Sequence, residues 1–212
     1  MLARDMPDWV WQGERGMLRS FDGNTAEANA AARALSDEIT AGRFTEVADV
    51  VPGARTLLVE LVPGSEPSEA LVRALEADAA PPQPPAGRRH EIAVTYDGED
   101  LAEVAASCRV MPREVVELHS GAEYTVAFIG FQPGFPYLIG LPPELAVPRL
   151  ASPRVKVPAG SVAIAGEYTG IYPDATPGGW RLIGRTETVL FDPGSAPPSL
   201  LQPGDVVRFV PA

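Results

Sequence analysis

A few side chains in the second half of the chain are of types that could do chemistry. His119 could act as a general acid or base, because the unperturbed pKa of histidine lies near neutrality. It also ends a predicted helix, whose dipole favours a cation, and the sequence leaves both interpretations open. Arg154 and Lys156 stand two apart on a predicted strand, so they face one way and could hold a carboxylate or phosphate; surface solvation is the alternative. His119 and Lys156 are the candidate catalytic residues.

Aromatic, glycine and proline residues alternate most densely in Phe128-Ile-Gly-Phe-Gln-Pro-Gly-Phe-Pro-Tyr137. Proline fixes φ and glycine opens positive φ, so this run predicts a shaped loop that leaves a strand. Similar loops follow at 157–161, 169–173 and 177–180, which predicts one surface assembled from strand ends. We expect a ligand groove there, although a barrel core would use the same residue types. Its expected aromatic lining is Phe131, Phe135, Tyr137, Tyr172 and Trp180.

Several other kinds of site are excluded by motif and composition. The chain has no Gly-x-x-x-x-Gly-Lys-Ser/Thr loop, no dinucleotide-binding glycine motif and no His-Glu-x-x-His. Two histidines and one cysteine leave too few nitrogen and sulfur ligands for a zinc site, so no metal is expected. Cys108 is either a nucleophile or a small buried residue at a helix end, and we favour the second. Ser161 is expected to close a turn rather than to attack a carbonyl.

Composition limits the class of protein. The 212 residues carry a formal net charge of −11, which argues against nucleic-acid binding because phosphate contacts need clustered Lys and Arg. No apolar run approaches the roughly 20 residues of a membrane span, and the N-terminus does not resemble a signal peptide. A single cysteine fits a reducing compartment. We therefore expect a cytoplasmic protein with no membrane and no nucleic-acid partner.

The elements that must position these residues fall into two parts. Residues 1–80 predict strand, helix, strand, strand, helix, with strands at 16–21, 44–51 and 55–62 and helices from Thr25 to Gly42 and from Pro67 to Leu75. This is most of a split βαβ unit, so we expect a small α/β, ferredoxin-like domain. It carries no metal or phosphate motif, and a scaffold or docking role is favoured for it.

Residues 81–89 form a proline-rich linker, and residues 90–212 predict a second domain. A strand at 90–96 precedes helices at 98–107 and 112–121. Short strands with Pro and Gly turns follow at 124–129, 154–157, 162–165, 180–184, 188–191 and 206–210. Many short strands of this kind indicate a barrel or a sandwich, so the fold class is α+β.

These residues also resemble a known family. The stretch His119-Ser-Gly-Ala-Glu-Tyr-Thr-Val-Ala-Phe-Ile-Gly-Phe-Gln-Pro-Gly-Phe-Pro-Tyr-Leu138 is similar to the signature of the KipI family, and so are 157–162, 164–166, 169–173, 177–180 and 182–186. The family includes the B-type subunit of bacterial 5-oxoprolinase, also known as allophanate hydrolase subunit 1, and its members match carboxyltransferase subdomains C and D. The resemblance covers nearly the whole chain.

The resemblance implies an N-terminal α/β domain, a cyclophilin-like β-barrel and an active site shared with a sister barrel subunit. That sister would be of the allophanate hydrolase subunit 2 type, which is the C-type subunit of 5-oxoprolinase. The resemblance also implies ATP-dependent opening of 5-oxoproline to glutamate, with ATP and Mg in the assembled complex and this chain inactive alone. Biotin belongs only to fused urea carboxylase relatives. The candidate substrate-binding residues are Phe131, Gln132, Phe135, Tyr137, Arg154, Ser161, Tyr168, Thr169, Tyr172 and Trp180.

Two departures from the family pattern concern the substrate. Tyr168 stands where the family has glutamine, and Lys156 stands where arginine is common. A second hypothesis follows from the founding member, which resembles an inhibitor of a histidine kinase. A regulatory binding protein of this kind would need no catalytic residue and could use the same groove.

Overall fold

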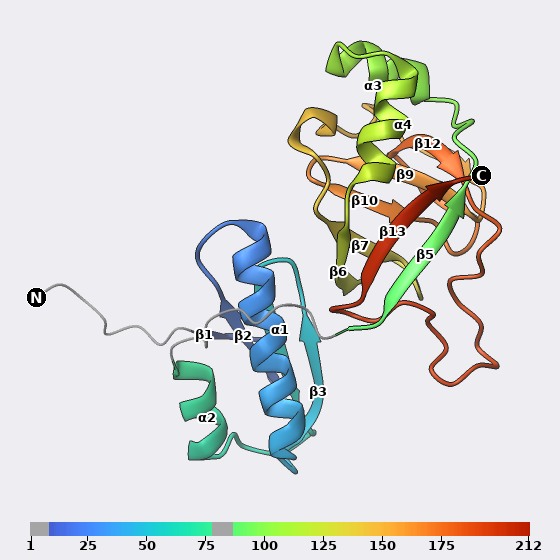
Figure 1. The fold of residues 1–212 in the computed structure, drawn as a ribbon. Helices are drawn as coiled ribbons and strands as arrows, with labels where there is room; N and C mark the ends of the chain where they lie inside the picture. The colour runs from blue at the N-terminus through green and yellow to red at the C-terminus, as the bar shows by residue number, and fades with distance from the viewer. Residues whose placement is uncertain (1–8, 78–86) are drawn as a thin grey trace, which may run out of the picture. The chain divides into compact units, whose positions relative to one another are not determined.

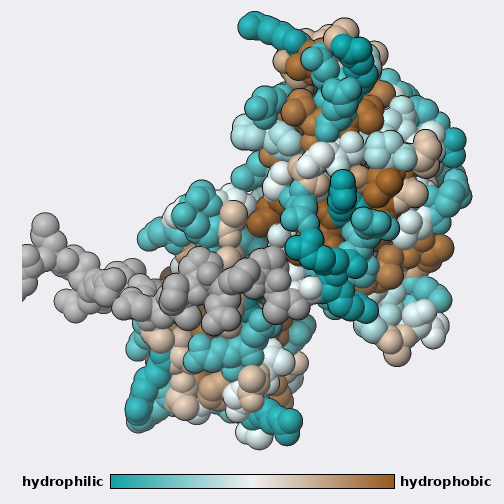
Figure 2. Space-filling model, viewed as in Figure 1, coloured by the Kyte–Doolittle hydropathy of each residue, from teal (hydrophilic) through white to brown (hydrophobic). Residues whose placement is uncertain are grey.

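The computed structural model describes residues 9–77 and 87–212. These residues form two compact units, residues 9–77 and residues 87–212, each with its own sheet and core. Most of the predicted linker, residues 81–86, lies outside the described residues, and Arg89 already belongs to a strand. Figure 2 shows a surface that is hydrophilic over wide areas, with apolar residues in smaller ones. Within the described part of the chain, no helix is both long and apolar enough to cross a membrane.

The first unit is an antiparallel sheet covered by two helices. Its strands are β1 (Trp9–Gln12), β2 (Gly16–Ser20), β3 (Val47–Pro52) and β4 (Thr56–Leu61), in the order β1-β2-β4-β3. Buried and half-buried residues alternate along β4, with Leu57, Val59 and Leu61 buried. They pack on the apolar stripes of α1 (Thr25–Gly42) and α2 (Glu69–Glu76). The order β2-β4-β3 is the predicted split βαβ arrangement, and β1 extends its edge.

The sequence indicates Thr25 as the cap of the first helix and Pro67 in the first turn of the second, and the structure differs on both points. Asn24, rather than Thr25, caps α1 by accepting a hydrogen bond from the backbone N–H of Glu27, whose side chain in turn accepts one from the N–H of Asn24. Ser68 caps α2, so Pro67 lies before the helix instead of in its first turn. In both cases a side-chain acceptor satisfies a free N–H and fixes the first residue of the helix.

The second unit is a nearly closed seven-stranded barrel. Its order is β12 (Arg181–Arg185), β9 (Ser161–Ala165), β10 (Tyr168–Ile171), β7 (Pro136–Ile139), β6 (Tyr124–Ile129), β13 (Val206–Pro211) and β5 (Arg89–Val94). Only β5 and β13 are parallel among these pairs of the described chain (Figure 1). Helices α3 (Leu101–Cys108) and α4 (Pro112–Gly121) pack on β12 and β13, beside the short 3₁₀-helix η1 (Pro143–Leu145). A separate two-stranded ribbon pairs β8 (Arg154–Val157) with β11 (Thr176–Gly178).

An isolated bridge joins the two edges of the barrel. The backbone N–H groups of Thr95 and Arg185 each donate to the carbonyl of the other at 2.9 Å, just beyond β5 and at the end of β12. Gly184 permits this approach, because a Cβ there would lie 2.7 Å from the Thr95 carbonyl oxygen. The closure removes most of the exposed edge that an open sheet would present.

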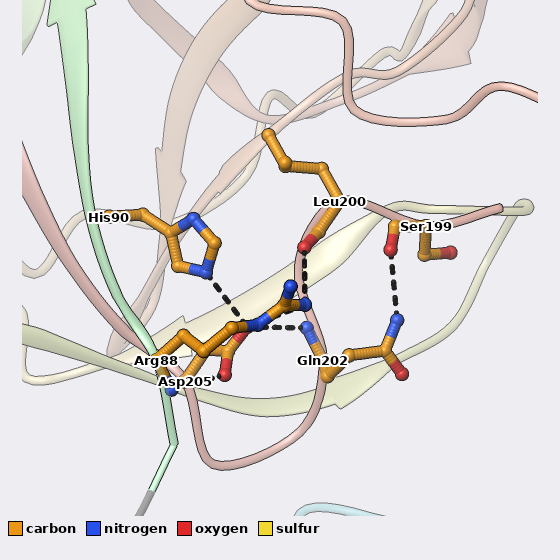
Figure 3. Close-up of polar contacts among 6 residues, drawn as sticks. All are labelled: Arg88, His90, Ser199, Leu200, Gln202 and Asp205. Atoms are coloured by element: carbon orange, nitrogen blue, oxygen red, sulfur yellow. Dashed lines mark hydrogen bonds and ion pairs between the residues drawn. The ribbon is translucent and has the colours of Figure 1, made fainter. Parts of the chain in front are cut away.

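A buried carboxylate holds the start of β5 against the turn before β13 (Figure 3). Asp205, 3% exposed, accepts hydrogen bonds from the backbone N–H of Arg88 (2.8 Å) and of Gln202 (3.0 Å). The Nε2 atom of His90 lies 2.9 Å from the Oδ2 atom of the same carboxylate. The carboxylate thus links two segments more than a hundred residues apart, where the parallel pairing of β5 and β13 begins.

Three expectations for this unit need correction. The predicted strand at 188–191 is wrong: Phe191 forms an isolated bridge with Ser199, and the backbone N–H of Thr188 donates to the hydroxyl of Thr186 instead of to a ladder. Residues 169–171 belong to β10, within the predicted loop 169–173, and Pro177 and Gly178 belong to β11, within the predicted loop 177–180. The strand β7 was not predicted: it begins at Pro136, inside the run 128–137 expected to form a loop, and the missing N–H of proline does not weaken the ladder at a first strand position.

Candidate functional site

The barrel unit carries a cavity of about 300 Å³ beside β7 and β10. We call this cavity the aromatic groove, and its walls come from segments that are far apart in the sequence. Its lining residues are Phe131, Phe135, Tyr137, Arg149, Pro153, Tyr172, Pro177, Gly178, Gly179 and Trp180. All five aromatic residues expected from the sequence are therefore together around one cavity.

The floor of the groove is a small core of its own. Phe135, Tyr172 and Trp180 are almost fully buried and belong to one apolar cluster with Val157. The ring of Phe135 meets Tyr172 at 5.0 Å and Trp180 at 5.4 Å between centroids, in both cases nearly edge to face. This geometry places the positive edge of one ring on the negative face of the next, so the floor is rigid and apolar.

Phe131 forms the rim and is the one aromatic residue of the groove that is mostly exposed, at 60%. Its φ is +69°, and the N–H of Gln132 donates to the carbonyl of Gly130 at 2.8 Å, so Phe131 is the central residue of a γ-turn with positive φ. That turn is rare and strained for a residue with a bulky side chain. The strain presents the ring to the groove instead of to solvent alone: the ring contacts Phe135 at 5.4 Å between centroids.

Gly178 sets the width of the groove on the opposite wall. A Cβ on this residue would lie 2.4 Å from the hydroxyl oxygen of Tyr172, which is closer than two atoms can approach. The wall and the floor touch here because the side chain is absent.

Arg154, predicted to bind substrate, is occupied by the protein itself. Its guanidinium pairs with Asp100 at 2.7 Å and with Glu99 at 2.5 Å. It also donates to the carbonyl of Trp180 at 3.4 Å. Arg154 therefore supports the segment that carries the Trp180 ring and does not line the groove.

The other predicted residues lie at varying distance from the groove. Tyr168 packs against its aromatic cluster from β10, with its ring 5.7 Å from that of Tyr137. Gln132 lines a neighbouring cavity of about 330 Å³ and donates to the carbonyl of Asp174 at 3.3 Å. Ser161 is buried at the start of β9. Lys156 is exposed on β8, in the ribbon whose other strand supplies Pro177 and Gly178 to the groove.

His119 lies in the barrel core and not on the groove. It is fully buried in the last turn of α4 and stacks on Phe209 at 4.6 Å. The Thr169 hydroxyl donates to the carbonyl of Ala163, so it accepts the hydrogen bond of His119 Nε2 at 2.9 Å. The Nδ1 atom then accepts from the Tyr96 hydroxyl at 2.8 Å. Both ring nitrogens are thus bonded inside the core, and the proton is on Nε2.

Burial lowers the pKa of His119 to about 3, so the imidazole is neutral at physiological pH. It lies at a helix end as predicted, but it is not a cation there. Burial also raises the pKa of the Tyr96 hydroxyl, its hydrogen-bond donor. His119 is not among the residues that line the groove, so its catalytic role remains a prediction.

Arg149 is a groove residue that the sequence reasoning missed. It follows η1 in an irregular segment, without periodicity or a motif that would have marked it. Its guanidinium lies 5.9 Å from the centroid of the Trp180 ring, close enough for a cation–π contact.

The remaining candidates do not form a second site. Cys108 ends α3, packs against the barrel core and has its thiol pKa raised by burial, as a structural residue would. In the described ranges 9–77 and 87–212, no three His, Cys, Asp or Glu side chains cluster in a way that could hold a metal ion.

Similarity to known proteins extends over nearly the whole chain. A family model described as carboxyltransferase domain, subdomain C and D, matches residues 7–201. A curated relative from Escherichia coli O157:H7, named as the B subunit of 5-oxoprolinase, is 51% identical over 173 residues, which are 78% of this chain and 78% of the relative. The relative of the same name from Haemophilus influenzae is 54% identical, and the match covers 58% of this chain and 60% of the relative.

Solved structures agree with the fold. The crystal structure of TTHA0988 superposes with a TM-score of 0.82 at 40% identity over 93% of this chain, which spans only 40% of that longer chain. The urea amidolyase of K. lactis, at 21% identity and a TM-score of 0.73, shares the fold over 96% of this chain and 15% of its own. The family resemblance expected from the sequence motifs is thus confirmed, and the chain belongs to the family of carboxyltransferase domains of the subdomain C and D type.

Proposed function

We propose that this chain is a subunit of an ATP-dependent 5-oxoprolinase and supplies the substrate-binding half of an active site that a sister barrel subunit completes. The relatives, which are named as B subunits of 5-oxoprolinase, support the reaction. Hydrolysis adds water across the ring amide of a small lactam and releases an amino acid, so the site must bind a five-membered ring and activate a water molecule.

The observation that carries this proposal is the composition of the aromatic groove. Its rigid aromatic floor fits the flat, mostly apolar ring of a lactam. None of the described residues that line it is a carboxylate, histidine, cysteine, serine or lysine. The groove thus binds but offers no general base, and amide hydrolysis needs one. A second chain is the source of that group in our proposal.

The exposed rim of the groove is where a second chain would meet this one. Phe131 on the rim and Val155 on β8 expose 60% and 89% of their surface, and Lys156 is exposed beside Val155. Apolar residues exposed beside a cavity are typical of protein interfaces. Lys156 is the cation that this chain would present to an anionic group there. ATP and its magnesium ion belong to the assembled complex in this proposal.

Co-expression with the sister barrel subunit tests the proposal. We expect one complex in size-exclusion chromatography, no turnover of 5-oxoproline by this chain alone, and ATP-dependent turnover once a third protein, which the family resemblance also implies, is added to the pair. Phe131→Ala, on the exposed rim of the groove, should strongly lower turnover. Val10→Ala, an exposed apolar position in the first unit, is the matched control and should leave turnover unchanged.

The same experiment decides against the regulatory alternative. If no complex forms, no 5-oxoproline is consumed and the chain instead inhibits a histidine kinase, the enzyme proposal is wrong.

A further inference from the structure

We infer that Arg149 is a specificity-determining residue that binds the carboxylate of the substrate, so the aromatic groove selects small cyclic amides bearing an anionic group. This inference rests on the proposed function for the identity of the ring, but the anion selectivity can be tested without the reaction.

The protein backbone fixes Arg149 at the rim of the groove. On one side, the N–H of Leu150 donates to the carbonyl of Gly179 at 2.7 Å. On the other, Nε of Arg181 donates to the carbonyl of Pro148 at 3.3 Å. The residues on both sides of Arg149 are therefore tied to the segment 179–181, which forms a wall of the groove and carries Trp180. The backbone of Arg149 is thus held at the rim, and its guanidinium lies 5.9 Å from the centroid of the Trp180 ring.

The other cations near the groove are neutralised by carboxylates or lie outside its lining. Arg154 is paired with Asp100 and Glu99, and Arg181 is paired with Glu103 at 2.7 Å. Lys156 is not among the residues that line the groove. Among the described residues, Arg149 has no carboxylate partner within ion-pair distance, and it is the only charged residue of the lining. Its guanidinium is thus the available partner for an anion that enters.

The electrostatic environment favours a carboxylate at this place. The guanidinium of Arg149 lies over the Trp180 ring. Its N–H groups point outward in the guanidinium plane, where they can donate hydrogen bonds to a ligand. Burial raises the pKa of the Tyr172 hydroxyl on the groove floor, so that group stays neutral and does not repel an anion. A planar fork of N–H donors binds a carboxylate through two parallel hydrogen bonds, which a neutral amide cannot match.

Direct binding of two matched ligands tests the inference. The full chain in complex with its sister subunit is titrated with 5-oxoproline and with 2-pyrrolidinone, the same ring without the carboxylate. We expect tighter binding of 5-oxoproline by about ten- to a hundredfold. Arg149→Gln should remove this preference, and Arg149→Lys should retain part of it. Arg208→Gln, at an exposed arginine on β13, loses the same charge and should keep the full preference.

Turnover gives a second readout: Arg149→Gln should raise the KM for 5-oxoproline by about ten- to a hundredfold and change kcat only a few-fold. An unchanged preference, or equal weakening of both ligands, overturns the inference. If the wild type binds neither lactam, the proposed substrate is wrong, and benzoate against benzamide then tests the charge selectivity alone. Preference for benzoate that disappears in Arg149→Gln supports the arginine's role, and absence of any preference contradicts it.

Discussion

The positive φ of Phe131 gives a prediction that separates backbone strain from side-chain contact. Phe131→Gly and Phe131→Ala remove the same ring from the rim of the groove, but only glycine adopts φ near +69° at no cost. We expect the glycine variant to be more stable than the alanine variant by about 0.5–1 kcal/mol, and both to bind ligand more weakly than the wild type. Urea unfolding measures the first difference and a ligand titration the second.

Equal stabilities of the two variants would mean that the turn is not strained. Equal ligand binding by the wild type and both variants would mean that the ring is not part of the site.

The burial of His119 predicts a pH dependence of stability. Its pKa is about 3 in the folded protein and near 6.5 when unfolded, so below pH 6.5 the unfolded chain binds a proton that the folded chain does not. Stability is therefore full above pH 6.5 and falls as the pH drops toward 3. We expect this residue alone to remove roughly 2 kcal/mol by pH 5. Urea midpoints at pH values of about 7.5, 6 and 5 measure the change across this range.

His119→Gln is the matched variant, because its side-chain amide can donate to Thr169 but does not titrate. We expect it to be less stable than the wild type near neutral pH and to lose stability less steeply as the pH falls to about 5. Turnover of the same variant near neutral pH addresses the catalytic hypothesis: a loss of about a hundredfold or more, with the fold intact, would restore His119 to the reaction.

At the scale of elements, Asp205 controls the junction of β5 and β13. Asp205→Ala removes the acceptor of two backbone N–H groups and of His90 in a buried place, so we expect a loss of about 3 kcal/mol. Asp192→Ala is the control, because Asp192 also accepts hydrogen bonds in a turn but is exposed. It should cost less than about 1 kcal/mol. A similar loss in both variants, measured by denaturant unfolding, would contradict the anchoring role.

The elements that follow the sequence prediction have a strong local pattern. The alternation along residues 57–61 and the helical spacing of Ala28, Leu35 and Ile39 are visible in the sequence, because burial on one face leaves a period. Residues 169–171 look like a loop in the sequence, since Gly170 and the following Tyr-Pro resemble turn signals. Tertiary pairing with β9 and β7 overrides that local preference.

The candidate site likewise has residues that the sequence predicts and residues that it does not. The aromatic residues of the groove could be predicted because their loops are dense in glycine and proline. The burial of His119 and the pairing of Arg154 with Asp100 could not, since these contacts join residues 50 and 54 positions apart. The sequence does not indicate Arg149 for a related reason. Arg149 stands out only because carboxylates pair with the neighbouring arginines, and these carboxylates lie on α3 and in the loop before it, far from Arg149 in the sequence.

At the scale of the whole molecule, the two separate cores predict separate units of stability. Leu57→Ala in the first unit and Ile164→Ala in the second each create a cavity at a fully buried site, worth about 2–5 kcal/mol. Amide hydrogen exchange followed by mass spectrometry on the full chain should show faster exchange in residues 9–77 for the first variant and in residues 87–212 for the second. Faster exchange throughout the chain for either variant would show that the units unfold together.

Lys156 has a further consequence, because it is the only lysine of the chain and it is exposed on β8. Apart from the terminal amine, an amine-selective reagent can therefore modify a single side chain, and peptide mass measurement would count that modification directly. If a sister subunit covers the ribbon formed by β8 and β11, the complex should resist acylation at Lys156, whereas the free chain should react quickly. The rate of acylation at Lys156 then reports whether the complex has assembled, and the measurement needs neither a mutation nor a substrate.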